Sequence, residues 1–348
     1  MSSARTRSWR DLRSALFIDR GPPDATTLVC GMGRSGTTWV AQLIDHDRSH
    51  RLMFEPFFPA RVPEARPFAY IQYMNPRDDD PQRRAAANRI LSGRLRNPAV
   101  DRSPRGWLFR RRLIKEIRCS LMLGWLARLR PALPIVLVVR HPLAVTASWL
   151  RLGWGTESQG ARTDYEVMTS QTRLLQDFPA LRDLASHIDP AAPLDRIVFQ
   201  WCAFHLVPLR QLPDGRPHIV HYENLLLHRE AEFERLASFL GIAIRRGALA
   251  AAFDQPSATS WHDDRTADFP IEEFTSRYDS GRDERDASHV AGRDAGRVAS
   301  ERLLHWQHAL STAQVDRALH LLSLCGLDAW YGRDGRPAGI SLPARGPS

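Results

Sequence analysis

Apolar runs of strand length alternate with helical patterns along most of the chain. The strand-like runs cover residues 26–32, 51–55, 111–117, 135–140 and 217–222, and the helical patterns lie near residues 37–46, 118–130, 142–152, 194–212 and 230–240. Such alternation is typical of a parallel sheet that is covered by helices. We therefore predict a three-layer α/β fold with a central parallel sheet.

Three longer polar stretches, at residues 59–110, 153–190 and 255–300, interrupt this pattern. With 348 residues and 43% apolar content, the chain is long enough for one large domain with insertions. The boundaries that we predict are an N-terminal segment over 1–25, a single domain over 26–335 and a flexible tail over 336–348. We expect the three insertions to be irregular and to form lids or substrate walls.

The first apolar run leads into a loop with three glycines, Gly31, Gly33 and Gly36, which opens a helix. Free backbone N–H groups and the helix dipole make such a loop a binding site for phosphate or sulfate. The spacing fits the dinucleotide motif G-x-G-x-x-G, with Glu55 as its ribose-binding acid. It also approximates the nucleotide triphosphate loop, except that Thr37 replaces the required lysine. An NAD-dependent oxidoreductase and a nucleotide kinase are therefore open alternatives.

A third template is the sequence R-S-G-T-T after a strand, in which hydroxyl groups join the backbone amides and Arg34 supplies the charge. This loop resembles the phosphosulfate-binding loop of sulfotransferases that use 3′-phosphoadenosine 5′-phosphosulfate (PAPS). The resemblance implies a P-loop-like fold. It also implies that the phosphosulfate is bound by Gly33, Arg34, Ser35, Gly36, Thr37 and Thr38.

A second motif follows the strand at 135–140. Arg140 ends this strand, and Pro142 at the first helical position marks a sharp turn into a helix. Ser148 lies on the second turn of that helix, so its hydroxyl and the Arg140 guanidinium are predicted to hold one anion together. Sulfotransferases use the similar pattern Arg-Asp-Pro-x5-Ser for the 3′-phosphate of the cofactor. Here His141 replaces the aspartate, which puts the local helix cap in question.

The chain contains 48 basic residues, and Lys115 is the single lysine among them. Arginine is a planar fork, whereas lysine is a compact charge that can approach one oxygen and lend a proton. Lys115 lies where a predicted strand reaches the sheet edge. The resemblance implies that it stabilises the bridging oxygen of the phosphosulfate, with Arg34 as a second catalytic cation.

Glu55 ends the strand at 51–55, in the sequence Phe-Glu-Pro, beside the glycine loop. A carboxylate near cationic groups stays ionised, and we predict that Glu55 is the general base for an acceptor hydroxyl. Glu116 is a weaker candidate. The aryl and steroid sulfotransferases have a histidine base two residues after the lysine, where this chain has Ile117. The chain is therefore more similar to the carbohydrate and tyrosyl-protein types.

Two aromatic residues extend the resemblance to the adenosine part of the cofactor. Trp39 follows the loop, and Tyr222 lies in His-Tyr-Glu-Asn-Leu, which is similar to a Tyr-Glu-Asp-Leu segment of the family. Both side chains suit stacking and a polar contact. Ser257 and Ser260 fall where related enzymes offer a serine to the cofactor.

The remaining composition favours an acidic ligand and gives no sign of a metal. The formal net charge of +9 suits a cofactor with several negative charges, and no nucleic-acid module is found. The four cysteines are far apart, and the histidines lack metal-ligand spacing. We find no apolar run of signal-peptide or membrane-spanning length, and we expect a cytoplasmic protein without a membrane anchor.

The function predicted from the sequence is transfer of a sulfuryl group from PAPS to a hydroxyl group of an acceptor, without a metal. The acceptor expected is a carbohydrate or another small molecule, and the cofactor product is adenosine 3′,5′-bisphosphate. A catalytically silent binding protein on the same fold is a further alternative.

Overall fold

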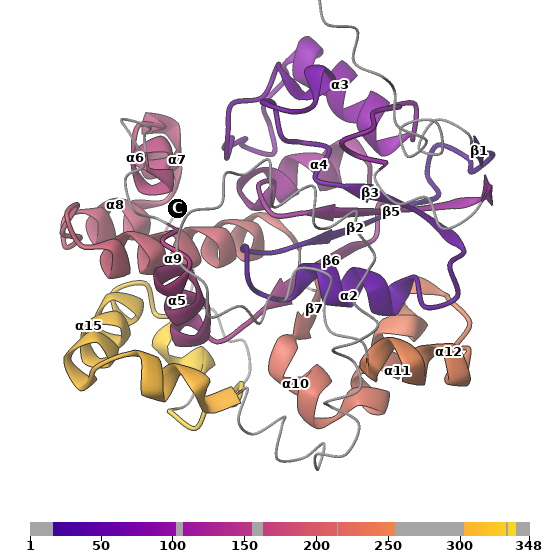
Figure 1. The fold of residues 1–348 in the computed structure, drawn as a ribbon. Coiled ribbons are helices and arrows are strands. Elements are labelled where there is room, and N and C mark those ends of the chain that lie inside the picture. The colour runs from indigo at the N-terminus through magenta and orange to yellow at the C-terminus, as the bar shows by residue number, and fades with distance from the viewer. Residues whose placement is uncertain are drawn as a thin grey trace, which may run out of the picture.

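The computed structural model describes residues 17–101, 107–154, 163–213, 215–254, 303–331 and 333–338. Its centre is a five-stranded sheet in the order β3-β5-β2-β6-β7, and all neighbouring strands are parallel (Figure 1). The strands are β2 (Thr26–Cys30), β3 (His50–Phe54), β5 (Arg111–Glu116), β6 (Ile135–Val139) and β7 (His218–His221). The predicted α/β fold with a central parallel sheet is therefore confirmed.

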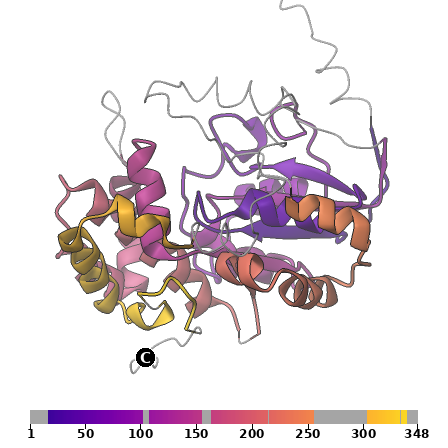
Figure 2. The ribbon, with the colours of Figure 1, turned by 60° about the horizontal axis from the view of Figure 1, so that its bottom comes forward.

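Helices cover both faces of the sheet, because alternate side chains of each strand point to opposite faces. Val29 and Val136 belong to one buried cluster, and Leu28 and Leu137 belong to the other. The first face is covered by α2 (Thr37–Ile44), α10 (Tyr222–Leu227), α11 (Arg229–Leu240) and α12 (Arg246–Asp254). Helices α2 and α12 contact each other and lie side by side in Figures 1 and 2. The second face is covered by η2 (Ser120–Met122), α4 (Leu123–Leu129), α5 (Pro142–Arg151) and α9 (Pro193–Gln211).

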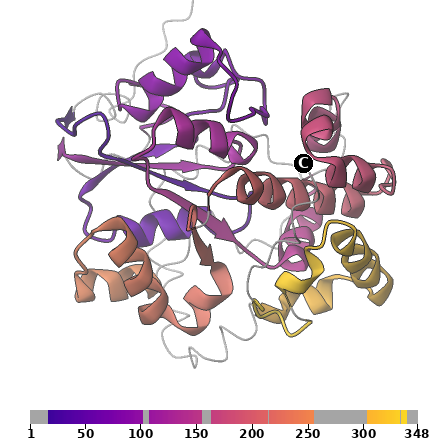
Figure 3. The ribbon, with the colours of Figure 1, turned by 180° about the vertical axis from the view of Figure 1, so that it is seen from behind.

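Helix α9 connects the second face of the sheet to a group of outer helices, as seen from behind in Figure 3. It contacts α4, α5, α6 (Asp164–Thr169), α8 (Pro179–Ala185) and α15 (Thr312–Ser323). Helix α7 (Thr172–Asp177) lies between α6 and α8 in the chain, and η4 (Asp328–Trp330) packs on α15. The long helix thereby ties the insertion at 153–190 to the sheet that carries the predicted site.

Two of the three insertions are partly helical, so the expectation of irregular structure was wrong for them. The first contains η1 (Pro63–Ala65) and α3 (Pro81–Leu91), and the second contains α6 to α8. Helix α3 starts at a proline, and the side chain of Asp80 accepts a hydrogen bond from the backbone N–H of Arg83 at 2.9 Å. Its buried face consists of two alanines, Ile90 and Leu91, which gives a weak periodic signal. The third insertion and Ser257 and Ser260 lie outside the described residues.

Residues from the predicted N-terminal segment form a second, smaller sheet. In it, β1 (Ile18–Asp19) pairs in parallel with β4 (Leu108–Phe109). The single-domain boundaries stay a prediction, and residues 339–348 of the tail lie outside the described part. Within the stretches that the structure describes, no helix combines the length and the apolar character needed to cross a membrane.

Candidate functional site

The predicted site residues come together at the carboxyl ends of the parallel strands. The glycine loop follows β2, Glu55 follows β3, Lys115 lies near the end of β5, and Arg140 follows β6. Strands β3, β5, β2 and β6 are consecutive neighbours in the sheet, so their carboxyl ends share one edge. Ligands of open parallel sheets bind at this edge.

The glycine loop is packed so closely that two of its glycines accept no side chain. Gly36 has a φ of 90°, and a Cβ atom there would lie 2.5 Å from Cδ2 of Tyr222. A Cβ atom on Gly31 would lie 2.5 Å from the carbonyl oxygen of Val138 on β6. The indole N–H of Trp149 donates to the carbonyl of Gly33 at 2.9 Å. The loop is thereby fixed against β6, α5 and α10.

The start of helix α2 has unused hydrogen-bonding capacity. Its N-cap is Gly36, which offers no side chain, and its first turn contains no acidic residue. The hydroxyl oxygen of Ser35 is buried and has no hydrogen-bond partner among the described residues. Buried polar atoms are normally paired, and a helix N-terminus attracts negative charge. These features are those of an anion-binding loop.

Three arginines gather beside this loop. Arg34 has a φ of 70°, and its Nε donates to the hydroxyl of Ser148 at 3.1 Å. Arg140 donates from Nη1 to the carbonyl of Arg34 at 2.9 Å. Burial, followed by the charges of Arg140 and Arg151, lowers the pKa of Arg34 to about 10. Arg140 forms no ion pair with a carboxylate of the described residues, so positive charge accumulates here.

The aromatic residues predicted for the cofactor support this cluster. The guanidinium of Arg140 lies 4.4 Å from the ring centre of Tyr222, a cation–π contact. Trp39 is 5% exposed and packs edge-on against Tyr222 at 5.6 Å and Phe253 at 6.0 Å. Its indole therefore forms part of the core behind Tyr222, and its contact with adenine stays a prediction.

A buried network fixes the turn that contains Arg140. The carboxylate of Glu223 accepts from the backbone N–H of His141 at 2.9 Å and from the hydroxyl of Tyr331 at 3.0 Å. The indole N–H of Trp201 donates to the carbonyl of Arg140 at 3.0 Å. Nδ1 of His141 accepts from the backbone N–H of Leu143 at 3.2 Å and caps α5. The histidine thus takes over the capping role that the missing aspartate put in question.

Glu55 is held by two cations at the neighbouring strand end. Nζ of Lys115 donates to its Oε1 at 2.6 Å, and Arg118 donates to its Oε2. Glu55 is 9% exposed and has a φ of 49°, which is a strained conformation for a residue with a side chain. Burial by itself raises the pKa of Glu55, but the charges of Lys115 and Arg118 outweigh it and lower the pKa to about 2. Burial lowers the pKa of Lys115, and Glu55 opposes that shift.

Glu116, the weaker candidate for the base, serves the backbone instead. Its carboxylate is fully buried and accepts from the N–H groups of Phe57 at 2.9 Å, Ile117 at 2.9 Å and Arg118 at 3.1 Å. Burial, together with the charge of Glu55, raises the pKa of Glu116. Glu116 thereby joins the turn after β3 to the turn after β5 and helps to place Glu55 beside Lys115.

Arg118 is the residue of this site that sequence reasoning missed. Its guanidinium lies 4.0 Å from the ring centre of Phe58 and 5.5 Å from that of Tyr70. Because nearly all basic residues are arginine, composition gives no signal for this one. Arg118 lies three residues after Lys115, where the chain leaves β5 at the same sheet edge, and this position could have predicted it as a site residue.

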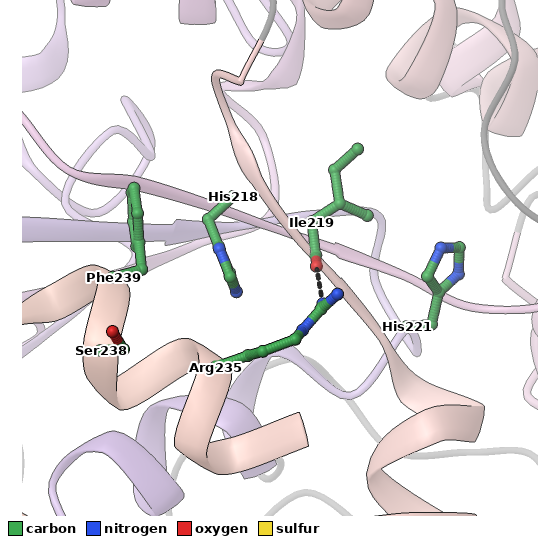
Figure 4. Close-up of a pocket in the computed structure, with 6 residues that line it drawn as sticks. All are labelled: His218, Ile219, His221, Arg235, Ser238 and Phe239. Carbon is green, nitrogen blue, oxygen red and sulfur yellow. Dashed lines mark hydrogen bonds between the residues drawn. The ribbon is translucent and has the colours of Figure 1, made fainter. Parts of the chain in front are cut away.

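A separate pocket of about 530 Å³ lies between strand β7 and helix α11 (Figure 4). Strand β7 is at one edge of the sheet, and β3, which leads to Glu55, is at the other edge. Arg235 extends across it and donates to the carbonyl of Ile219 at 3.5 Å and to Glu232 at 3.0 Å. Burial and the charge of Arg235 lower the pKa values of His218 and His221 to about 4. None of the predicted site residues lines this pocket.

One cluster of described residues has metal-ligating atoms close together. Oxygen and nitrogen atoms of Asp45, Asp47 and His50 lie within 4.8 Å of one another, in the turn between α2 and β3. The carboxylates of Asp45 and Asp47 accept from the backbone N–H groups of His50 at 2.8 Å and Ser49 at 3.1 Å. These contacts are those of a tight turn.

The chain is similar to a known protein family over more than half of its length. The sequence profile of the sulfotransferase family matches residues 27–246. Among solved structures, the chain is similar to the sulfotransferase domain from the curacin biosynthetic pathway, with 14% identity, 86% of this chain and 96% of that chain covered, and a TM-score of 0.43. It is also similar to the sulfotransferase domain from the Synechococcus PCC 7002 olefin synthase, with 15% identity, 87% and 94% covered, and a TM-score of 0.39. No curated protein sequence matches. Because the family match spans more than half of the sequence, the chain belongs to the sulfotransferase family.

Proposed function

We propose that the protein transfers a sulfuryl group from PAPS to a hydroxyl group of a carbohydrate or another small molecule. One observation carries this proposal: the only lysine of the chain lies 2.6 Å from a buried glutamate, at the strand edge that also holds an uncapped helix N-terminus and a cluster of arginines. Transfer of a sulfuryl group to a hydroxyl needs an anion site, a base and a cation close together, and this edge offers all three.

The residues at the loop fit a bound phosphosulfate. The Ser35 hydroxyl, which has no partner in the described part of the chain, and the first amides of α2 offer donors, and Arg34 supplies positive charge. Arg140 and Ser148 would hold the 3′-phosphate, with Tyr222 beneath the Arg140 guanidinium. Like charges gathered in one place are costly without a counter-ion, so an anion with several charges would stabilise this cluster.

When bound, PAPS supplies the sulfuryl group and leaves as adenosine 3′,5′-bisphosphate. Glu55 takes the proton of the acceptor hydroxyl at Oε1, the atom that faces Lys115. With a pKa of about 2, the carboxylate is a weak base as long as two cations hold it. A turn of Lys115 toward the leaving oxygen frees Oε1 and raises the basicity of Glu55. The same movement brings positive charge to the place where negative charge develops.

The proposed base also bears on the type of sulfotransferase. A glutamate after β3 and Ile117 in place of a histidine favour the carbohydrate or tyrosyl-protein type over the aryl and steroid type. The described cysteines are free and buried, which suits a reducing compartment such as the cytoplasm. The proposed reaction requires no metal ion.

Calorimetric titration distinguishes the proposed cofactor from its competitors. We expect adenosine 3′,5′-bisphosphate to bind, with NAD and ATP binding at least tenfold more weakly. Transfer of labelled sulfate from PAPS to a panel of sugars, phenols, lipids and peptides then tests turnover and reveals the acceptor class. Tight binding of NAD alone would refute the proposal, and binding of the bisphosphate without transfer to any acceptor or to water would indicate a silent binding protein.

A further inference from the structure

We propose that Arg118 is a positioning residue for the general base: it keeps Glu55 in place and ionised while Lys115 turns away from it. This inference rests on the proposed function, because it assigns Lys115 to the leaving group. It concerns a residue that does not itself touch the reacting atoms. The two oxygens of Glu55 are divided between the two cations, Oε1 to Lys115 and Oε2 to Arg118.

The two cations are held very differently. The Lys115 ammonium lies at the end of a flexible stem, 4.3 Å from the ring centre of Phe54. The planar guanidinium of Arg118 contacts the rings of Phe58 and Tyr70, at 4.0 Å and 5.5 Å. Both rings belong to the chain after β3, and stacking on them restricts rotation of the guanidinium. Both cations are largely enclosed, but the compact ammonium of Lys115 has one ring contact and the planar guanidinium of Arg118 has two, so we assign the movement to Lys115.

Further polar groups lie behind Arg118. Tyr70 lies close to both Arg118 and Asp164, and burial followed by the charge of Asp164 raises the pKa of Tyr70 to about 12. Asp164 in turn accepts from the side chain of Gln200 on α9 at 3.0 Å. Asp164 on α6 and Gln200 on α9 thus belong to the polar surroundings of Tyr70 and of the guanidinium. One donor remains unused, because Nε of Arg118 is buried without a partner among the described residues.

The need for such a residue follows from the burial of Glu55. Without opposite charges, burial would raise the pKa of a carboxyl group above its ordinary value, and a protonated Glu55 cannot act as a base. The charged and titratable groups around it are Lys115, Glu116, Arg118, Tyr70 and Asp164. Once Lys115 has turned away, Arg118 is the only cation among them, and Glu116 opposes ionisation.

The experiment imitates the turn of Lys115 by removing its charge. Enzyme labelled with ¹³C-carboxyl glutamate is prepared as Lys115→Met, Lys115→Met with Arg118→Gln, and Lys115→Met with Arg118→Lys. The signal of Glu55 is assigned by its loss on Glu55→Gln and is followed by NMR from pH 4 to 8. We expect Glu55 to stay ionised in the first and third proteins. In the second, its titration midpoint should rise by about 1–3 pH units, the usual effect of losing an adjacent opposite charge.

Turnover of the single variants gives the second readout. With PAPS and the best acceptor of the panel, or with water as acceptor, Arg118→Gln should lower kcat by about 10- to 100-fold and leave the KM for PAPS within threefold. Arg118→Lys should recover most of the pH profile, and Arg128→Gln on the exposed side of α4 is the matched control. Thermal melting checks that each variant is folded.

Two results would overturn the inference. One is a Glu55 midpoint that is the same with and without Arg118 in the Lys115→Met background. The other is a kcat for Arg118→Gln equal to that of the control. The NMR titration needs neither cofactor nor acceptor, so it reports on Arg118 even if wild-type enzyme transfers no sulfate. Failure of the proposed function, seen as no bisphosphate binding by wild type, is therefore a separate outcome.

Discussion

Strands β3 and β5 carry a buried group of charges at each end, and the two groups differ in how completely they are bonded. The amino-end cluster consists of Asp19, Arg51, Asp101 and Arg112. The carboxyl-end cluster consists of Glu55, Lys115 and Arg118. Arg51 lies opposite Arg112 in the sheet, and Phe54, next to Glu55, lies opposite Lys115. The same pair of strands thus positions both clusters.

Every guanidinium nitrogen of Arg51 has a partner. Nε donates to Asp101 at 2.8 Å, Nη1 donates to Asp19 at 2.9 Å and to the carbonyl of Gly93 at 2.7 Å, and Nη2 donates to Asp101 at 3.0 Å. Arg112 is equally bound, with Nε 2.7 Å and Nη2 2.9 Å from the carboxylate of Asp19. Charges that are paired in this way are buried without an unmet hydrogen bond.

The carboxyl-end cluster is bonded less completely. Nε of Arg118 has no partner among the residues that the structure describes, and Glu55 occupies a strained backbone conformation. Strain and unmet hydrogen bonds persist where function needs them. Charge in this sheet is thus fully paired where it only holds the chain together, and incompletely paired where a ligand is proposed to bind.

The largest effect is expected from Glu55→Gln. The amide keeps the size of the side chain but cannot accept the acceptor's proton, so kcat should fall by about 10²- to 10⁴-fold. Binding of adenosine 3′,5′-bisphosphate, measured by calorimetry, should change less than threefold, because Glu55 is not one of the proposed phosphate ligands. Glu230→Gln, on an exposed position of α11, is the control. Near-normal turnover of Glu55→Gln would show that Glu55 is not the general base.

The next effect is expected at the other end of the strands. Arg51→Met leaves the carboxylates of Asp19 and Asp101 buried with fewer partners, which typically lowers the free energy of unfolding by about 3–5 kcal/mol. Urea unfolding measures this loss, with Arg128→Met as the exposed control. The protein that remains folded should bind the bisphosphate as wild type does. A stable Arg51→Met protein with weakened bisphosphate binding would reverse the roles assigned to the two clusters.

The contrast also explains what the sequence could predict. Strand ends and helix starts follow from local hydrophobic periodicity and from glycine and proline at turns. Residues at such positions, including Glu55, Lys115 and Arg140, were therefore predicted at the sheet edge where they lie. The amino-end cluster escaped prediction because its hydrogen-bonded pairs are 32 to 93 residues apart in sequence. Arg118 escaped because the rings that it contacts, Phe58 and Tyr70, lie just before and inside the insertion at 59–110, whose weak periodicity leaves its position to tertiary packing.

A smaller change is expected from Arg140→Ala. This guanidinium lies at the proposed 3′-phosphate site, and a hydrogen bond from a charged group contributes about 1.5–3 kcal/mol, or roughly 10- to 150-fold in Kd. Calorimetry with adenosine 3′,5′-bisphosphate should show this weakening. Adenosine 5′-phosphate, which lacks the 3′-phosphate, should bind to wild type and to Arg140→Ala with the same affinity. Arg182→Ala on α8 is the control. Equal loss for the two ligands would place Arg140 at another part of the cofactor.

The smallest effect is expected in the pH dependence of stability. Burial raises the pKa of Asp19, but hydrogen bonds from Arg112 and Arg51 outweigh it, so the folded pKa lies below the ordinary value of 3.8. A carboxyl group with a lowered folded pKa contributes stability above its unfolded pKa, and this contribution is lost as the pH falls through the folded pKa. The lowered pKa values of His218 and His221 also make the unfolding free energy fall with pH, so the contribution of Asp19 is taken as the difference in unfolding free energy between wild type and Asp19→Asn. This difference should be level from pH 7 to about 4 and should shrink below about pH 4. Asp19→Asn should be less stable than wild type at pH 7, and its unfolding free energy should fall less steeply below about pH 4. If the unfolding free energies of the two proteins fall equally steeply in acid, Asp19 does not link stability to pH.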